Sequence, residues 1–168
     1  MKTHQQPNII TLQLICFALC AGMLIFAIVA IVTTIEGKSP GTQQNPAPSS
    51  SLGLLLLVVA GGLGIGNLVA GPAIRLAAVR GAKELWRGDG SVEEREHALW
   101  SRFTTQVVTR AAFAESLGIV GILALFLGGP PLGWWGMAAP AIALVLIFWA
   151  LPSQFKYESF LAQATSEA

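Results

Sequence analysis

Long apolar runs alternate with short polar segments along the chain. Asp, Glu, Lys and Arg are absent from positions 3–35, 39–74 and 116–155. The hydrocarbon core of a bilayer is about 30 Å thick, and roughly 20 apolar residues in a helix cross it. Each run is long enough for one crossing, and the last is long enough for two. We therefore predict an all-α fold, a four-helix membrane bundle, with spans at about residues 9–33, 52–74, 108–127 and 134–151.

Two polar segments separate the first three spans. Residues 34–51 are rich in Thr, Gln, Ser, Gly and Pro, which predicts a flexible extracytoplasmic loop. The helical pattern of the second span bends at Gly71-Pro72, continues beyond the membrane and stops at Gly88-Asp89-Gly90. Ser91 and Glu94 match a capping box, so a third helix begins there. We expect residues 75–107 to form a cytoplasmic helical hairpin on a single transmembrane domain, 1–168, that ends in a short polar tail.

The distribution of charge sets the orientation. Charged residues make up 11% of the chain, against about a quarter in soluble domains. The hairpin and both ends carry nine of the ten basic residues, and only Lys38 lies on the other side. The positive-inside rule then places both termini in the cytoplasm of a plasma (inner) membrane protein. A net charge of +1 indicates no nucleic-acid partner.

Few side chains are suited to metal binding or catalysis. Cys16 and Cys20 lie one helical turn apart inside the first apolar run, where a thiol packs as a small hydrophobe. His4 and His97 are far apart, so we predict no metal site and no cofactor. Ser116 has no histidine within reach to activate it, and we expect no enzymatic activity.

Small residues recur at four-residue spacing on the second and third spans. Gly62, Gly66 and Ala70 share one helix face, and Ala114 and Gly118 do the same on the next helix. Helices in lipid associate by close approach of their backbones, which small residues permit. These five residues are therefore predicted to pack helices together.

Glu115 lies well inside the third apolar span. A carboxylate there costs on the order of 2.5–3.5 kcal/mol, so we expect it to be protonated or paired. Counting outward from the turn brings it near Leu63 and the glycine-rich face of the second span. Arg110 is rotated by roughly 140° from it on the same helix, so Asn67, Arg75 or a second subunit are better partners. Glu115, Asn67 and Arg110 form the candidate intramembrane polar or ion site.

The stretch 114–122 resembles the carboxylate-bearing helix of the rotary ATPase proteolipid (c) subunit. Gly62-x-Gly64-x-Gly66 is similar to the glycine-rich first helix of that family. The resemblance covers residues 53–128 and implies a hairpin with a cytoplasmic loop, in which Glu115 carries a transported proton or sodium ion. The loop itself departs from the family, since Arg87-Gly88-Asp89-Gly90 replaces its Arg-Gln-Pro sequence.

The hairpin also carries apolar stripes at roughly helical spacing. They consist of Leu76, Val79 and Trp86 on one arm and Leu99, Trp100 and Phe103 on the other. Such stripes pack together, lie on the membrane surface or dock a partner. The leading hypothesis is a non-enzymatic accessory or scaffold subunit, with the lipid bilayer, a second copy or a membrane partner protein as its partners. The alternative is proton or ion translocation by an oligomer, or by a small transporter, that uses Glu115.

Overall fold

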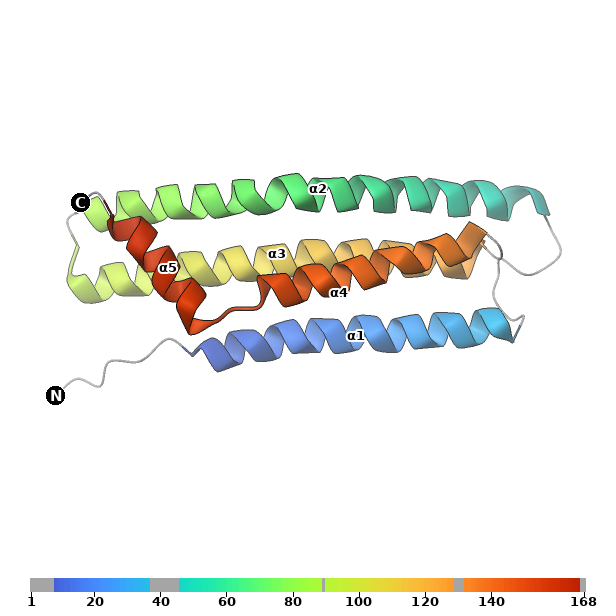
Figure 1. Ribbon diagram of the computed structural model, residues 1–168, viewed down its shortest axis with the longest axis horizontal. Coiled ribbons are helices and arrows are strands. Elements are labelled where there is room, and N and C mark those ends of the chain that lie inside the picture. The colour runs from blue at the N-terminus through green and yellow to red at the C-terminus, as the bar shows by residue number, and fades with distance from the viewer. Residues whose placement is uncertain (1–7, 37–45, 89, 129–131, 167–168) are drawn as a thin grey trace.

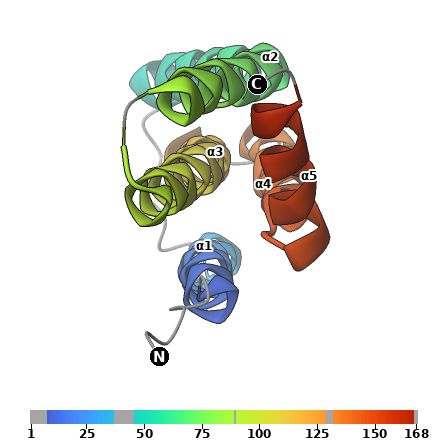
Figure 2. The same ribbon diagram turned by 90° about the vertical axis from the view of Figure 1, so that its left-hand side faces the viewer.

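The computed structural model describes residues 8–36, 46–88, 90–128 and 132–166. It is all-α, as predicted, with four long helices side by side and a fifth laid across one end (Figures 1 and 2). In chain order the elements are α1 (Ile9–Ile35), α2 (Pro46–Arg87), α3 (Val92–Gly128), the 3₁₀ helix η2 (Leu132–Met137), α4 (Ala138–Ala150) and α5 (Gln154–Thr165). The 3₁₀ helix and α4 together make the fourth span.

Several boundaries differ from the predicted ones. The second helix begins at Pro46 rather than near residue 52, so the last part of the expected 34–51 loop is helical. Prolines are tolerated in a first turn because the amide groups there have no intrahelical acceptor. The rest of that loop, residues 37–45, lies outside the described residues. As predicted, the helix continues through Pro72 to Arg87.

The predicted hairpin of α2 and α3 is present and capped as expected. Ser91 N donates to Glu94 Oε2 at 2.9 Å, and Glu94 N donates to Ser91 Oγ at 3.2 Å. Arg95 closes the turn from the α3 side, with its guanidinium donating to Gly90 O and Trp86 O. The sequence pattern therefore located this turn correctly.

The helix α3 is the centre of the bundle. Its buried residues extend from Leu99 to Leu125, and it contacts α1, α2, α4 and α5. In Figure 2, viewed along the bundle, it lies between α2 and α1. In contrast, most side chains of α2 that face away from α3 are exposed.

The polar tail predicted after residue 152 is in fact the helix α5. The side chain of Ser153 caps it by accepting a hydrogen bond from Lys156 N at 3.3 Å. Phe160 and Ala164 are buried on its inner face. Tyr157 and Phe160 pack edge-on or tilted against Phe103, and Tyr157 also meets Trp100, with ring centroids 5.2–5.7 Å apart. Trp100 and Phe103, in the apolar stripe of the α3 arm, thus pack against a helix of the same chain.

Candidate functional site

The antiparallel register of α2 and α3 is close to the one counted from the turn. Asn67 Nδ2 donates to Phe113 O at 3.1 Å, and a methyl placed on Gly64 would touch Leu117. Further toward the turn, a methyl on Gly71 would lie 3.6 Å from the Arg110 guanidinium. The level of Glu115 near residue 63 is therefore right to within a helical turn.

The side of α3 on which Glu115 lies was predicted wrongly. Two residues along a helix turn it by about 200°, so Glu115 lies nearly opposite Leu117, which faces α2. It is instead close to Cys20 of α1, near enough for its charge to act on that thiol. Glu115 is partly buried, and its carboxylate has no hydrogen-bond or ion-pair partner among the described residues. It does not face the glycine-rich helix.

The three predicted site residues are therefore separate. The side-chain amide of Asn67 donates hydrogen bonds to the backbone oxygens of Leu63 and Phe113, at 3.2 and 3.1 Å. Arg110 lies against Gly71 on the α2 side, whereas Glu115 lies on the α1 side. They do not form one polar site.

The small residues predicted to pack helices have different surroundings on α3 and on α2. Ala114 and Gly118 are buried, and a methyl on Gly118 would strike the Met23 sulfur of α1 and meet Ala143 of α4 at 3.2 Å. A methyl on Gly62 or Gly66 would meet nothing within 4 Å. Gly118 and Gly121 of α3 turn toward α1, α4 and η2, whereas Gly128 at its end lies against Gly53 of α2.

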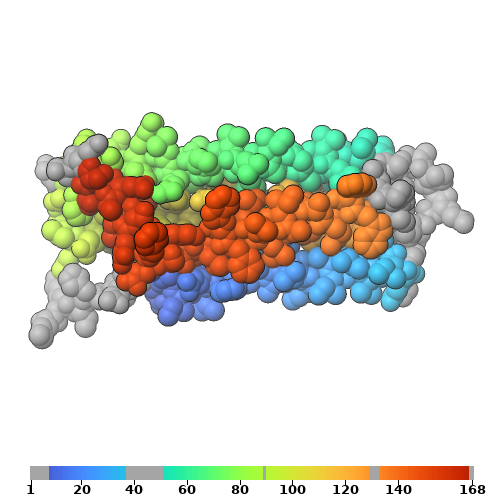
Figure 3. Space-filling model, viewed as in Figure 1, coloured from blue at the N-terminus to red at the C-terminus, as the bar shows by residue number. Residues whose placement is uncertain are grey.

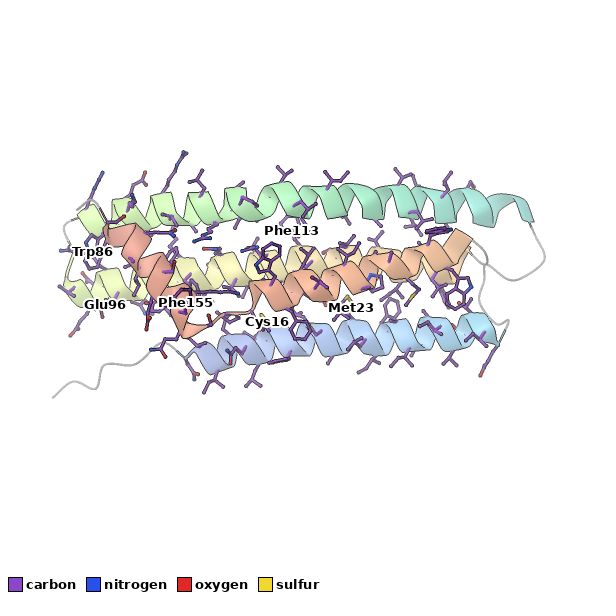
Figure 4. The ribbon with its side chains drawn as sticks, in the orientation of Figure 1. Cys16, Met23, Trp86, Glu96, Phe113 and Phe155 are labelled. Atoms are coloured by element: carbon purple, nitrogen blue, oxygen red, sulfur yellow. The ribbon has the colours of Figure 1, made fainter. Side chains whose placement is uncertain are left out.

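The two cysteines pack inside the bundle. Cys16 and Cys20 are free thiols buried on the inner face of α1. In Figure 4, Cys16 and Met23 lie along the same helix, toward α4 and α3. A packing role for both thiols is consistent with this placement.

A cavity of about 150 Å³ lies near the end of the bundle that carries α5. Its lining comes from four helices: Arg75 of α2; Phe103, Gln106, Val107 and Arg110 of α3; Trp149 and Ala150 of α4; and Phe155, Lys156, Ser159 and Phe160 of α5. In Figure 3 the surface of α3 is visible at the bottom of a hollow between α2, α4 and α5. Three of the lining side chains are cationic.

Two of the three cations of this cavity donate hydrogen bonds to neutral groups. Arg75 Nη2 donates to Gln163 Oε1 at 3.3 Å. Lys156 Nζ donates to the carbonyl oxygens of Trp149 and Leu151 at 2.7 and 2.8 Å, where α4 ends. Burial, and then the neighbouring charge of Arg110, hold the pKa of Lys156 below its ordinary value. The cavity is therefore a concentration of positive charge.

Two of these cavity residues, Arg110 and Arg75, were predicted near Glu115, and the structure places them around the cavity instead. The sequence pattern did not predict Lys156 or Gln106 as neighbours of Arg110, because the helix that carries Lys156 was predicted to be a polar tail. Its apolar spacing of 157, 160, 161 and 164 is helical, and that signal, together with Ser153 as cap, was available.

The fold and these features define a class of protein. Four helices, Ile9–Ile35, Ser51–Arg87, Val92–Gly128 and Gly133–Ala150, are long and apolar enough to cross a membrane. Much of their apolar surface faces outward, as expected where lipid is the solvent. The chain is a multi-pass α-helical membrane protein. Comparison with protein-family models, curated proteins and solved structures gave no match.

Proposed function

We propose that this protein is a non-enzymatic accessory or scaffold subunit of the plasma (inner) membrane. In this proposal both termini and the α2–α3 turn lie in the cytoplasm, and a partner helix packs on the outer face of α2. The observation that carries the proposal is the open space around Gly62 and Gly66. The distribution of basic residues supports the orientation.

The outer face of α2 is apolar and exposed over several turns. Val58, Ile65 and Val69 are each about two-thirds exposed, and Gly62 and Gly66 lie among them. Lipid tails cover any apolar side chain equally well, so burial from water gives no reason for glycine there. Glycine at four-residue spacing does permit a second helix to approach closely. A membrane helix, from a second copy or from another protein, fits this face best.

The double variant Gly62→Leu/Gly66→Leu tests the proposal. The full chain, of 17.7 kDa, is purified from native membranes in a mild detergent and its native mass is measured. We expect the wild-type chain in a complex heavier than the monomer and the double variant as a folded monomer. Gly22→Leu is the matched control, because Gly22 on α1 is equally open and should leave the complex intact. An unchanged complex in the double variant contradicts the proposal.

Translocation of a proton or ion through Glu115 is the second candidate function. The observation that favours it is a partly buried carboxyl group between α1 and α3, inside a span and without a partner among the described residues. Under this function, Glu115→Gln abolishes proton or sodium flux in proteoliposomes, and a carbodiimide labels Glu115 selectively. Under the accessory function, Glu115→Gln leaves ion permeability and the native mass unchanged.

A further inference from the structure

The cationic cavity between α2, α3, α4 and α5 has no acidic partner. None of the acidic side chains that the structure describes lines it, although Arg75, Arg110 and Lys156 all do. Arg110 is close enough to Arg75 and to Lys156 for their charges to act on one another. Arg110 is partly buried, and Arg75 and Lys156 are exposed beside it. Gathering like charges around a partly buried one is costly unless an anion compensates them.

Gln106 is the second, independent observation. It is only 8% exposed, lines the same cavity, and its Oε1 has no hydrogen-bond partner among the described residues. A buried polar atom without a partner is costly, because it has lost its hydrogen bonds to water. The oxygen and the NH₂ group of a carboxamide have nearly the same shape. Rotating the Gln106 carboxamide by half a turn therefore presents its NH₂ group to a ligand in place of the oxygen.

The remaining donors point to an oxyanion. The Arg110 guanidinium makes no hydrogen bond within the described part of the chain, and a guanidinium offers five N–H donors in a planar fork that matches a phosphate. Lys156 uses two of its three N–H donors on carbonyl oxygens. Ser159 adds a hydroxyl to the lining. Together these groups can surround one tetrahedral anion.

Two exposed aromatic side chains stand at the rim of the cavity. Trp149 is 69% and Phe155 79% exposed, and Phe155 is labelled on α5 in Figure 4. Large aromatic side chains are typical of the level of lipid headgroups. We therefore expect the opening to lie at the level of the phosphates of a bilayer.

We propose that Arg75, Arg110, Lys156 and Gln106 form a binding site for a phosphate group, that of an anionic phospholipid headgroup or of a free phosphate. The site is independent of the outer face of α2 and of Glu115. Its occupant neutralises the cavity and ties α5 to the α2–α3 hairpin.

The test uses the purified full chain in zwitterionic detergent. In one arm, phosphatidylglycerol or phosphatidylcholine is added and the retained lipid is measured by native mass spectrometry. In the other arm, inorganic phosphate is titrated and tryptophan fluorescence is followed, since Trp149 lines the cavity. Binding of phosphatidylglycerol alone identifies a headgroup as the source, and saturable binding of inorganic phosphate identifies the free anion.

Arg110→Gln should weaken binding at least about tenfold, the loss expected for a charged hydrogen bond. Arg102→Gln is the matched control. A methyl placed on Gly81 of α2 would lie 3.6 Å from the Arg102 guanidinium, as one on Gly71 would from that of Arg110, but Arg102 does not line the cavity. It should change the affinity less than about twofold. If Arg110→Gln does not fold, Arg75→Gln at the exposed rim takes its place. Equal losses in the site variant and in Arg102→Gln, or no preference for either phosphate probe over phosphatidylcholine, overturn the proposal.

Discussion

The two longest helices, α2 and α3, carry similar patterns of small residues in different surroundings. On α3, a methyl added to Gly121 would strike Ala139 and would lie 2.5 Å from the backbone oxygen of Gly136. On α2, the same addition at Gly62 or Gly66 would meet open space. Small residues at helical spacing therefore indicate that a close approach is possible, but not which helix makes it.

The difference follows from position in the bundle. Helix α3 is surrounded by α1, α2, α4 and α5, so its small residues are enclosed by this chain. Helix α2 packs mainly on α3, which leaves its opposite face to lipid or to a partner. Substitutions on the two helices should therefore act differently: those on α3 should lower the stability of the monomer, and those on the outer face of α2 should change its association.

The largest expected effect is at Gly121. Gly121→Leu places a large side chain against the backbone of η2, which cannot move aside as a flexible side chain does. We expect a loss of about 3 kcal/mol or more in the free energy of unfolding, measured by titration with a denaturing detergent. The same substitution at Gly22, in open space, should cost less than about 0.5 kcal/mol. Similar losses at both positions would remove the contrast between enclosed and open glycines.

A smaller effect is expected at Gly118, because its nearest neighbour is a flexible side chain. Gly118→Ala drives its methyl against the Met23 sulfur, and the thioether adjusts at a cost of about 1–2 kcal/mol. Combining it with Met23→Ala should reveal a coupling of about 1 kcal/mol. Strict additivity of the two losses would show that α1 does not pack here.

Asn67 links α2 to α3 by a hydrogen bond within a predicted span. Replacing it should lower the free energy of unfolding by less than Gly118→Ala does. Asn67→Leu removes the hydrogen bond to Phe113 O, and such interhelical bonds contribute about 0.6 kcal/mol on average. Ser116→Ala is the control, since Ser116 Oγ donates only within its own helix, to Ala112 O at 2.9 Å. A larger loss for Ser116→Ala than for Asn67→Leu would contradict the assigned register.

The smallest effect is expected at the turn that joins the two helices. Hydrogen bonds from Ser91, first from its backbone and then from its side chain, hold the pKa of Glu94 below its ordinary value of 4.5. The contribution of this cap is thus fully present above pH 4.5 and is lost as the pH falls through the lowered pKa. Ser91→Ala should speed amide exchange in the first turn of α3 about fivefold at neutral pH. Glu94→Gln should abolish the pH dependence of the protection of these amides against exchange. If the variant keeps the same pH dependence, the cap is not its cause.

Much of the fold could be predicted from local signals. The length of the apolar runs located the four spans, and Ser91 with Glu94 located the start of α3. The helix α5 was not predicted, although Ser153 and its apolar spacing indicate it, because Pro152 and the polar residues after it are also typical of a tail. The early start of α2 at Pro46 was missed because proline is allowed in the first turn yet is common in loops.

The candidate sites were less predictable, for a geometrical reason. Counting from the turn gave the level of Glu115 along the bundle, but not the rotation of α3 about its axis, which decides whether α1 or α2 faces that residue. The cationic cavity joins Arg75, Arg110 and Lys156 from three helices, and Lys156 is 46 positions beyond Arg110 in the sequence. No local pattern brings such residues together.

The central claim is that lipid surrounds the four spans with the α2–α3 turn on the cytoplasmic side. Labelling with a membrane-impermeant maleimide tests it, using His97→Cys beside the turn and Trp135→Cys, at a site 74% exposed, at the other end of the bundle. The native Cys16 and Cys20 are buried and should stay unlabelled in the folded chain. In intact spheroplasts we predict labelling of Trp135→Cys at once and of His97→Cys only after permeabilisation. Labelling of both from outside, or of His97→Cys alone, would contradict the claim.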